Sequence, residues 1–173
     1  MSVDPQVFAS KIIGPVLQQL GLDQYRAQAA TELLLGTALQ ESELIYRRQV
    51  GGGPALGLFQ MEPNTHDDIW ANFLQYHPVL AKVLEQLADS PLVEGGSVPH
   101  PSATLVENND AYAAGMCRVH YLRAGQIVGQ TPLPEAGDIE AMGAYWKRFY
   151  NTSYGAGAAA EFVVRWRSVH PEV

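Results

Sequence analysis

The chain has 173 residues, of which 47% are hydrophobic and 17% charged, and this balance excludes a chain that is disordered throughout. Its formal net charge of −7 lacks the basic excess typical of nucleic-acid-binding proteins, so we expect no nucleic-acid partner. No apolar run approaches the roughly 20 residues that span a bilayer, so we expect no membrane insertion. The length favours one domain, residues 1–173, and we expect a monomer.

The cysteine and histidine content argues against metal and cofactor chemistry. The single cysteine, Cys117, excludes a disulfide within the chain and a thiolate-rich metal site. The five histidines are scattered and show no metal-ligand spacing: His66, His77, His100, His120 and His170. We therefore expect no metal ligands and no cofactor. The N-terminus has no basic segment ahead of an apolar one, so we also expect no signal peptide.

The spacing of apolar residues predicts helices along most of the chain. Asp4 and Pro5 are typical of a helix start, and the pattern after them predicts a helix over 5–20. Asp23 is the predicted cap of a second helix, which runs to about residue 44. It is apolar on most sides, which is typical of a helix buried in the middle of a domain.

In the rest of the chain, further segments with helical spacing of apolar residues alternate with segments rich in Gly and Pro. Asn64 and Asp138 are predicted helix caps, and the stretch 89–105 is predicted to be a long loop. No alternating strand of useful length is found, so the predicted fold class is mainly α. The further predicted helices span about 64–76, 78–88, 109–123, 138–149 and 158–169.

Glu41 is the residue most informative about function. It shares one face of its predicted helix with apolar or small residues at helical spacing: Ala38, Thr37, Leu34 and Ala30. Burial on that face would raise the pKa of the carboxyl group, as a general acid working near neutral pH requires. From its position alone, Glu41 is also open to interpretation as a surface residue at a helix end.

Two motifs connect Glu41 with a known family. The segments Ala38-Leu39-Gln40-Glu41-Ser42 and Gly57-Leu58-Phe59-Gln60-Met61-Glu62-Pro63-Asn64-Thr65 resemble the lytic transglycosylases of the lysozyme superfamily. That family has Glu-Ser at a helix end, followed by Gly-Leu-Met-Gln-(Ile/Met)-x-Pro-x-Thr, with Phe59 here in place of Met. Weaker similarities follow at 113–123 and 143–145, and the resemblance covers about residues 33–157.

The second half of the chain departs from the family pattern. Trp146-Lys147-Arg148 follows Tyr145 where the family has Asn-Ala-Gly, and Ala111 stands where the family usually has Asn. Tyr150-Asn151-Thr152 is a second match to the tyrosine motif. The segment 145–152 is similar to the phage-associated branch of the family.

The resemblance implies a lysozyme-like single domain that cleaves the β-1,4 bond between N-acetylmuramic acid and N-acetylglucosamine in peptidoglycan. Glu41 would protonate the leaving oxygen and then accept the proton of the muramyl 6-hydroxyl, giving a 1,6-anhydro product. The helix that ends at Glu41 would form one wall of a cleft, the segment 57–65 its floor and the Tyr145 helix its opposite wall. The implied substrate-binding residues are Ser42, Gly57, Leu58, Phe59, Gln60, Met61 and Tyr145 or Tyr150.

Two alternatives remain open at this point. A hydrolytic muramidase would use water and a second carboxylate, for which the candidates are Glu62, Asp67 and Asp68. A non-catalytic glycan-binding or structural phage component would keep the fold without the activity. A wall-cleaving protein without a signal peptide would reach the wall after phage lysis, in a virion or by dedicated secretion.

Overall fold

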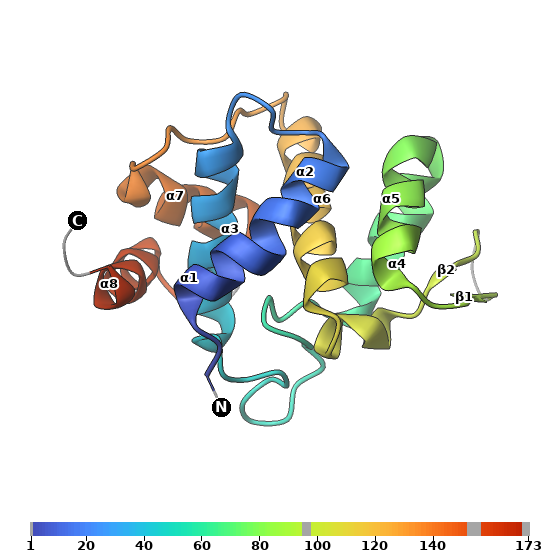
Figure 1. Ribbon diagram of the computed structural model, residues 1–173, viewed down its shortest axis with the longest axis horizontal. Coiled ribbons are helices and arrows are strands. Elements are labelled where there is room, and N and C mark those ends of the chain that lie inside the picture. Colours follow the sequence, from blue (N-terminus) through green and yellow to red (C-terminus); the bar gives the residue numbers. More distant parts are fainter. Residues whose placement is uncertain (1, 95–97, 152–156, 171–173) are drawn as a thin grey trace.

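The structure is a computed structural model that describes residues 2–94, 98–151 and 157–170. It is mainly helical, as predicted. Helix α3 (Ala27–Ser42) and helix α6 (Asp110–Ile127) lie in the middle of the molecule, and the N-terminal helical segment packs across both (Figure 1). None of the helices in the described part of the chain combines the length and hydrophobicity that crossing a bilayer demands.

The N-terminal segment is one continuous helical rod, with its ends where the sequence predicted them. It comprises α1 (Pro5–Phe8), the π-helical η1 (Ala9–Ile13) and α2 (Gly14–Leu20). A carboxylate oxygen of Asp4 accepts a hydrogen bond from the Val7 amide at 2.8 Å, which caps the first turn. Gly21 ends the rod in the left-handed conformation.

Helix α3 is the buried central helix, although it begins later than predicted. Asp23 does not cap it, because the Asp23 carboxylate forms a buried two-bond ion pair with Arg118 of α6, at 2.7 and 2.8 Å. Further along, Thr37 and Tyr121 share a buried hydrogen bond of 2.7 Å between their hydroxyl groups. Contacts with α6 and with the N-terminal rod therefore fix the orientation of α3.

The middle of the chain contains helix α4 (Pro63–Asn72), the 3-10 turn η2 (Leu74–Tyr76) and helix α5 (Pro78–Ala88). The prediction that Asn64 caps α4 is wrong, because Pro63 already occupies the first helical turn. The predicted loop 89–105 contains a short antiparallel hairpin of β1 (Leu92–Val93) and β2 (His100–Pro101), and then the start of the 3-10 turn η3 (Ala103–Glu107). Residues 95–97 of this loop lie outside the described ranges.

The C-terminal part covers α3 from one side (Figure 1). Helix α7 (Ile139–Trp146) is capped by Asp138, as predicted, and passes directly into the π-helical turn η4 (Lys147–Asn151). Helix α8 (Ala159–Val169) packs against α3 and α7. One hydrophobic cluster includes buried residues of all these helices, and α3 contributes seven of them: Ala29, Ala30, Leu33, Leu34, Leu35, Ala38 and Leu39.

Candidate active site

A cleft of about 820 Å³ opens beside the C-terminal end of α3. Four segments line it: the last turn of α3, the chain between residues 46 and 65, the C-terminal half of α6, and η4. No described residue of the stretch 89–105 is among its lining residues. The polar or charged side chains that face this cleft include Glu41, Gln60, Glu62, His120, Arg148 and Asn151.

Glu41 lies in the wall of this cleft, on the last turn of α3, and is mostly buried. Its Oε1 atom accepts a hydrogen bond of 2.8 Å from the indole Nε1 of Trp146. Burial raises the pKa of the Glu41 carboxyl group from 4.5 to about 7, and the Trp146 hydrogen bond offsets part of that rise. At pH 7 both the acid and the carboxylate are therefore substantially populated, as a group that donates and then accepts a proton requires.

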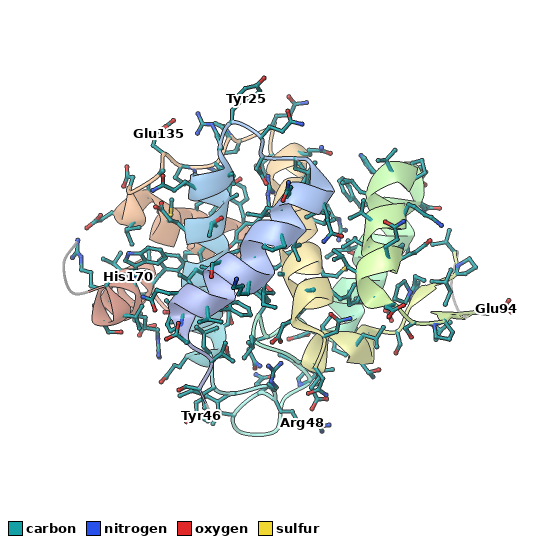
Figure 2. All side chains as sticks on the ribbon, viewed as in Figure 1. Tyr25, Tyr46, Arg48, Glu94, Glu135 and His170 are labelled. Carbon is teal, nitrogen blue, oxygen red and sulfur yellow. The ribbon has the colours of Figure 1, made fainter. Side chains whose placement is uncertain are left out.

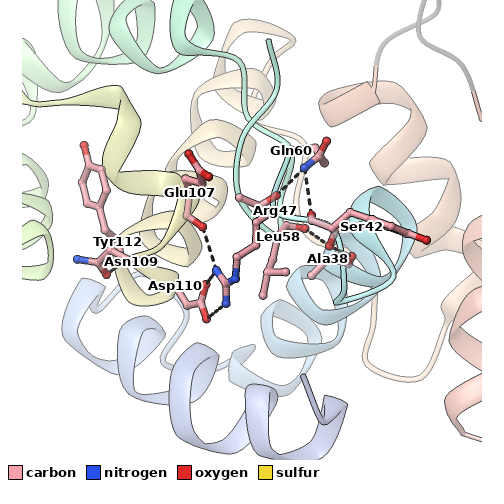
Figure 3. A network of polar contacts seen from close by, with 11 residues as sticks. Ala38, Ser42, Arg47, Leu58, Gln60, Glu107, Asn109, Asp110 and Tyr112 are labelled. Carbon is pink, nitrogen blue, oxygen red and sulfur yellow. Dashed lines mark hydrogen bonds and ion pairs between the residues drawn. The ribbon is translucent and has the colours of Figure 1, made fainter. Parts of the chain in front are cut away.

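Ser42 connects the end of α3 with the segment that forms the cleft floor. Its hydroxyl group lies 2.7 Å from the carbonyl oxygen of Leu58 and 3.0 Å from that of Ala38, and it donates to these acceptors (Figure 3). The side chain is 1% exposed and does not line the cleft. The hydroxyl therefore holds the segment after α3 against the helix, and a role of Ser42 in substrate binding stays a prediction.

The segment 56–61 is a tight turn closed by two hydrogen bonds of 3.0 Å between Leu56 and Met61. Gly57 has a φ of +74°, and a Cβ atom there would lie 2.0 Å from the carbonyl oxygen of Val106. Backbone packing therefore requires glycine at this position, and Gly57 is not among the residues that line the cleft. Leu58 and Phe59 are each 1% exposed, so their side chains pack in the core, and their contact with substrate stays a prediction.

Gln60 and Met61 do line the cleft, as expected of a floor segment. Gln60 has a φ of +47°, and its Nε2 donates to the carbonyl oxygens of Gly57 at 2.8 Å and Tyr46 at 3.3 Å (Figure 3). The Gln60 side chain is thus held by the loop behind it. Tyr46 also lines the cleft, and its ring projects outward near Arg48 at the edge of the molecule (Figure 2).

The two candidate tyrosines lie in different places. Tyr150 lines the cleft, and its hydroxyl donates to the carbonyl oxygen of Phe59 at 2.7 Å. Tyr145 lines a second hollow, which also contains Tyr25, at the end of the molecule away from Tyr46 (Figure 2). Its hydroxyl donates to the carbonyl oxygen of Thr131 at 3.1 Å, so of the two tyrosines that the motifs left open, Tyr150 is the one beside Glu41 in the cleft.

Two residues of this site, Trp146 and His120, were not predicted from the sequence. In the sequence, Trp146 has the spacing of an ordinary core residue of a helix, and nothing in that pattern indicates that its indole N–H donates to Glu41. The sequence around His120 matches no metal-binding or catalytic motif. In the structure, its ring lies edge-on to that of Tyr150, with the ring centroids 5.0 Å apart. Burial, with a contribution from Arg123, lowers the pKa of His120 to about 4, so the ring is neutral at pH 7. Within the described ranges, its buried Nδ1 has no hydrogen-bond partner.

Of the candidates for a second carboxylate, only Glu62 lines the cleft, where it is exposed. Asp67 contacts His66 at 2.7 Å, and Asp68 pairs with Arg123. Neither aspartate is among the lining residues of this cleft.

Two pairs of consecutive basic residues, Arg47-Arg48 and Lys147-Arg148, lie near the cleft segments in the sequence. Arg47 forms a two-bond ion pair with Asp110, at 2.6 and 2.9 Å (Figure 3), and Arg48 forms one with Glu107. These ion pairs hold the loop after α3 against η3 and the start of α6. Arg148 instead lines the cleft, with its guanidinium 4.8 Å from the centre of the Phe149 ring. Thr152, the end of the second tyrosine motif, lies outside the described residues.

Comparisons with protein-family models, with curated proteins and with solved structures find no match for this chain. Its function is therefore inferred from the chemistry of the cleft and from the motifs that surround Glu41.

Proposed function

We propose that this protein is a peptidoglycan-cleaving lytic transglycosylase with a lysozyme-like fold and Glu41 as its single catalytic carboxyl group. The observation that carries the proposal is the Glu41 carboxyl group in the cleft wall, with a pKa of about 7. The motifs around Glu41 and Gln60, which resemble those of lytic transglycosylases, supply the substrate class.

In the first step, protonated Glu41 donates its proton to the glycosidic oxygen between N-acetylmuramic acid and N-acetylglucosamine. Bond cleavage develops oxocarbenium character at the muramyl C1, and the leaving sugar departs with its 4-hydroxyl protonated. Burial is what keeps Glu41 protonated near neutral pH, because it disfavours the carboxylate. The indole N–H of Trp146 stabilises the carboxylate that this step produces.

In the second step, the Glu41 carboxylate accepts the proton of the muramyl 6-hydroxyl while that oxygen attacks C1. The 1,6-anhydro bond forms, Glu41 regains its proton, and no water is consumed. One carboxyl group with two accessible protonation states is sufficient for this sequence. Gln60, His120 and Asn151 offer polar groups for the sugar substituents along the cleft.

The charge at the cleft supports the same substrate class. The guanidinium of Arg148, which is exposed at the cleft, would attract the carboxylates of peptidoglycan stem peptides. For a phage-associated protein of this kind, the wall would be reached after lysis, in the virion or by dedicated secretion.

A hydrolytic muramidase is the second candidate function, and the position of Glu62 favours it specifically. Glu62 lies in the same cleft as Glu41 and is exposed, so its carboxylate could activate a water molecule. Under hydrolysis, Glu62→Gln would abolish turnover. Under the transglycosylase mechanism, the 6-hydroxyl of the substrate replaces that water, and Glu62 has no role in proton transfer.

The proposal is tested by the release of soluble fragments from purified peptidoglycan by the wild type, Glu41→Gln and Glu43→Gln. Glu43 is the matched control, because it lies just beyond the same helix end but pairs with Arg165 at 2.6 Å. We expect Glu41→Gln to reduce the rate by at least about 100-fold and Glu43→Gln to stay close to wild type. Wild-type turnover by a folded Glu41→Gln protein would overturn the assignment.

A further inference from the structure

His66, Asp67 and His100 converge where α4 meets the β1–β2 hairpin, and none of the three lines the Glu41 cleft. Each offers one nitrogen or oxygen atom, and these three atoms lie within 4.8 Å of one another. The prediction of scattered histidines is therefore wrong for this pair, whose rings lie 5.6 Å apart between centroids. We propose that these three residues form a binding site for a divalent transition-metal ion, with Zn²⁺ as the best fit.

The hydrogen bonding of His100 fixes which of its nitrogens is available to a metal. Nδ1 lies 2.9 Å from the carbonyl oxygen of Pro101, and a carbonyl oxygen can only accept, so Nδ1 carries the proton. Nε2 therefore has its lone pair available, 4.0 Å from Oδ1 of Asp67. Metal-binding histidines commonly donate their second ring N–H to a backbone carbonyl in this way.

His66 is held by an equally defined set of partners. Its Nε2 lies 2.6 Å from the hydroxyl oxygen of Tyr112, which also accepts a hydrogen bond of 3.1 Å from the indole of Trp70. This leaves Nδ1 of His66 facing Oδ1 of Asp67 at 2.7 Å. Because a phenol both donates and accepts, Tyr112 can serve His66 when Nδ1 carries a proton and when Nδ1 binds a metal.

Asp67 gives the site an opening to solvent. The side chains of His66 and His100 are buried, whereas that of Asp67 is 53% exposed. Ligand atoms around a tetrahedral Zn²⁺ lie about 3.3 Å apart, given bond lengths near 2 Å. Rotation of the exposed Asp67 carboxylate would bring its oxygen closer to Nε2 of His100, and the hairpin that carries His100 would move toward α4 to bring the two imidazoles to that separation. Two imidazoles and one carboxylate favour zinc over magnesium or calcium, which prefer oxygen-only sites.

The position of the site in the fold indicates what a bound ion would do. His66 and Asp67 belong to α4, whereas His100 belongs to β2. A metal ion would therefore crosslink the hairpin to α4, and its binding free energy would add to the stability of the folded state.

The test is isothermal titration of the metal-free protein with Zn²⁺ for the wild type, Asp67→Asn, His100→Ala and Asp68→Asn. Asp68 is the matched control, because it is the neighbouring aspartate and pairs with Arg123. We expect one Zn²⁺ to bind the wild type and Asp68→Asn with similar affinity, and Asp67→Asn to lower that affinity by at least about 10-fold. His100→Ala should do the same or more.

Thermal unfolding provides a second readout that does not depend on enzymatic activity. Saturating Zn²⁺ should raise the Tm of the wild type and Asp68→Asn by about 5 °C or more and leave that of Asp67→Asn nearly unchanged. Asparagine has nearly the same shape as aspartate, and position 67 is exposed, so Asp67→Asn should fold like the wild type. This variant therefore tests the site even if His100→Ala does not fold. The absence of saturable binding in the wild type, or equal binding by the two asparagine variants, would overturn the proposal.

Discussion

Replacing Glu41 with Gln should stabilise the protein at alkaline pH while abolishing its proposed activity. The pKa of Glu41 is 4.5 in the unfolded reference and about 7 in the folded protein. Below pH 4.5 the group is protonated in both states and costs nothing. Between pH 4.5 and 7 the unfolded chain loses this proton while the folded protein keeps it, so folding stability falls as the pH rises. Above pH 7 the full cost of the buried carboxylate is present.

The magnitude follows from the difference between the two pKa values. At about 1.4 kcal/mol for each pH unit, this difference corresponds to about 3 kcal/mol. Glutamine has no charge to bury, and its side-chain oxygen can still accept the hydrogen bond from Trp146. Relative to wild type, Glu41→Gln should therefore gain about 3 kcal/mol more in the free energy of unfolding at pH 8 than at pH 4.

Urea unfolding followed by far-ultraviolet circular dichroism, at pH 4 and pH 8, measures this difference. Glu62→Gln is the control, because it makes the same substitution at an exposed position in the same cleft. We expect it to change stability by less than about 0.5 kcal/mol at either pH. A Glu41→Gln effect that is equal at both pH values would refute the reasoning that burial raises the pKa of Glu41.

Two further predictions concern the residues that support Glu41. Trp146→Phe removes a hydrogen bond to the Glu41 carboxylate, so the pKa of Glu41 should rise further. In a pH–rate profile, the decline of activity at alkaline pH should then move up by about one pH unit. A profile that keeps its position while activity falls would show that Trp146 acts through packing only. Gly57→Ala should destabilise the protein by more than about 3 kcal/mol in urea unfolding, because its Cβ would meet the Val106 backbone; wild-type stability would contradict that packing.

The helix ends show what local sequence is able to predict. Asp4 and Asp138 were predicted as caps, and both accept hydrogen bonds from amides of the following turn. Asp23 and Asn64 carry the same local signal and are not caps. Asp23 is instead paired with Arg118, a residue distant in the chain, and Asn64 follows a proline that already begins the helix. Capping is predictable until a tertiary contact competes for the side chain.

The candidate site shows the same limit on a finer scale. Gly57 and Ser42 were predicted to bind substrate, but the structure gives both a packing role: Gly57 leaves room for the Val106 carbonyl, and the Ser42 hydroxyl donates to that of Leu58. Tyr145 and Trp146 are consecutive, so they point about 100° apart on their helix, and only packing decides which one reaches Glu41. The pairing of His66 with His100 depends on the hairpin, which no local pattern predicted.

The proposed mechanism has the muramyl 6-hydroxyl attack C1 with Glu41 as the proton donor and acceptor. It is tested by mass spectrometry of purified peptidoglycan digested by the wild type and by Glu41→Gln. We expect wild-type fragments that end in 1,6-anhydromuramic acid, each lighter by one water molecule than the hydrolytic product, and none from Glu41→Gln. Fragments that carry the added water would contradict this mechanism and favour hydrolysis with Glu62. No fragments from either protein, across several types of cell wall, would contradict catalysis altogether.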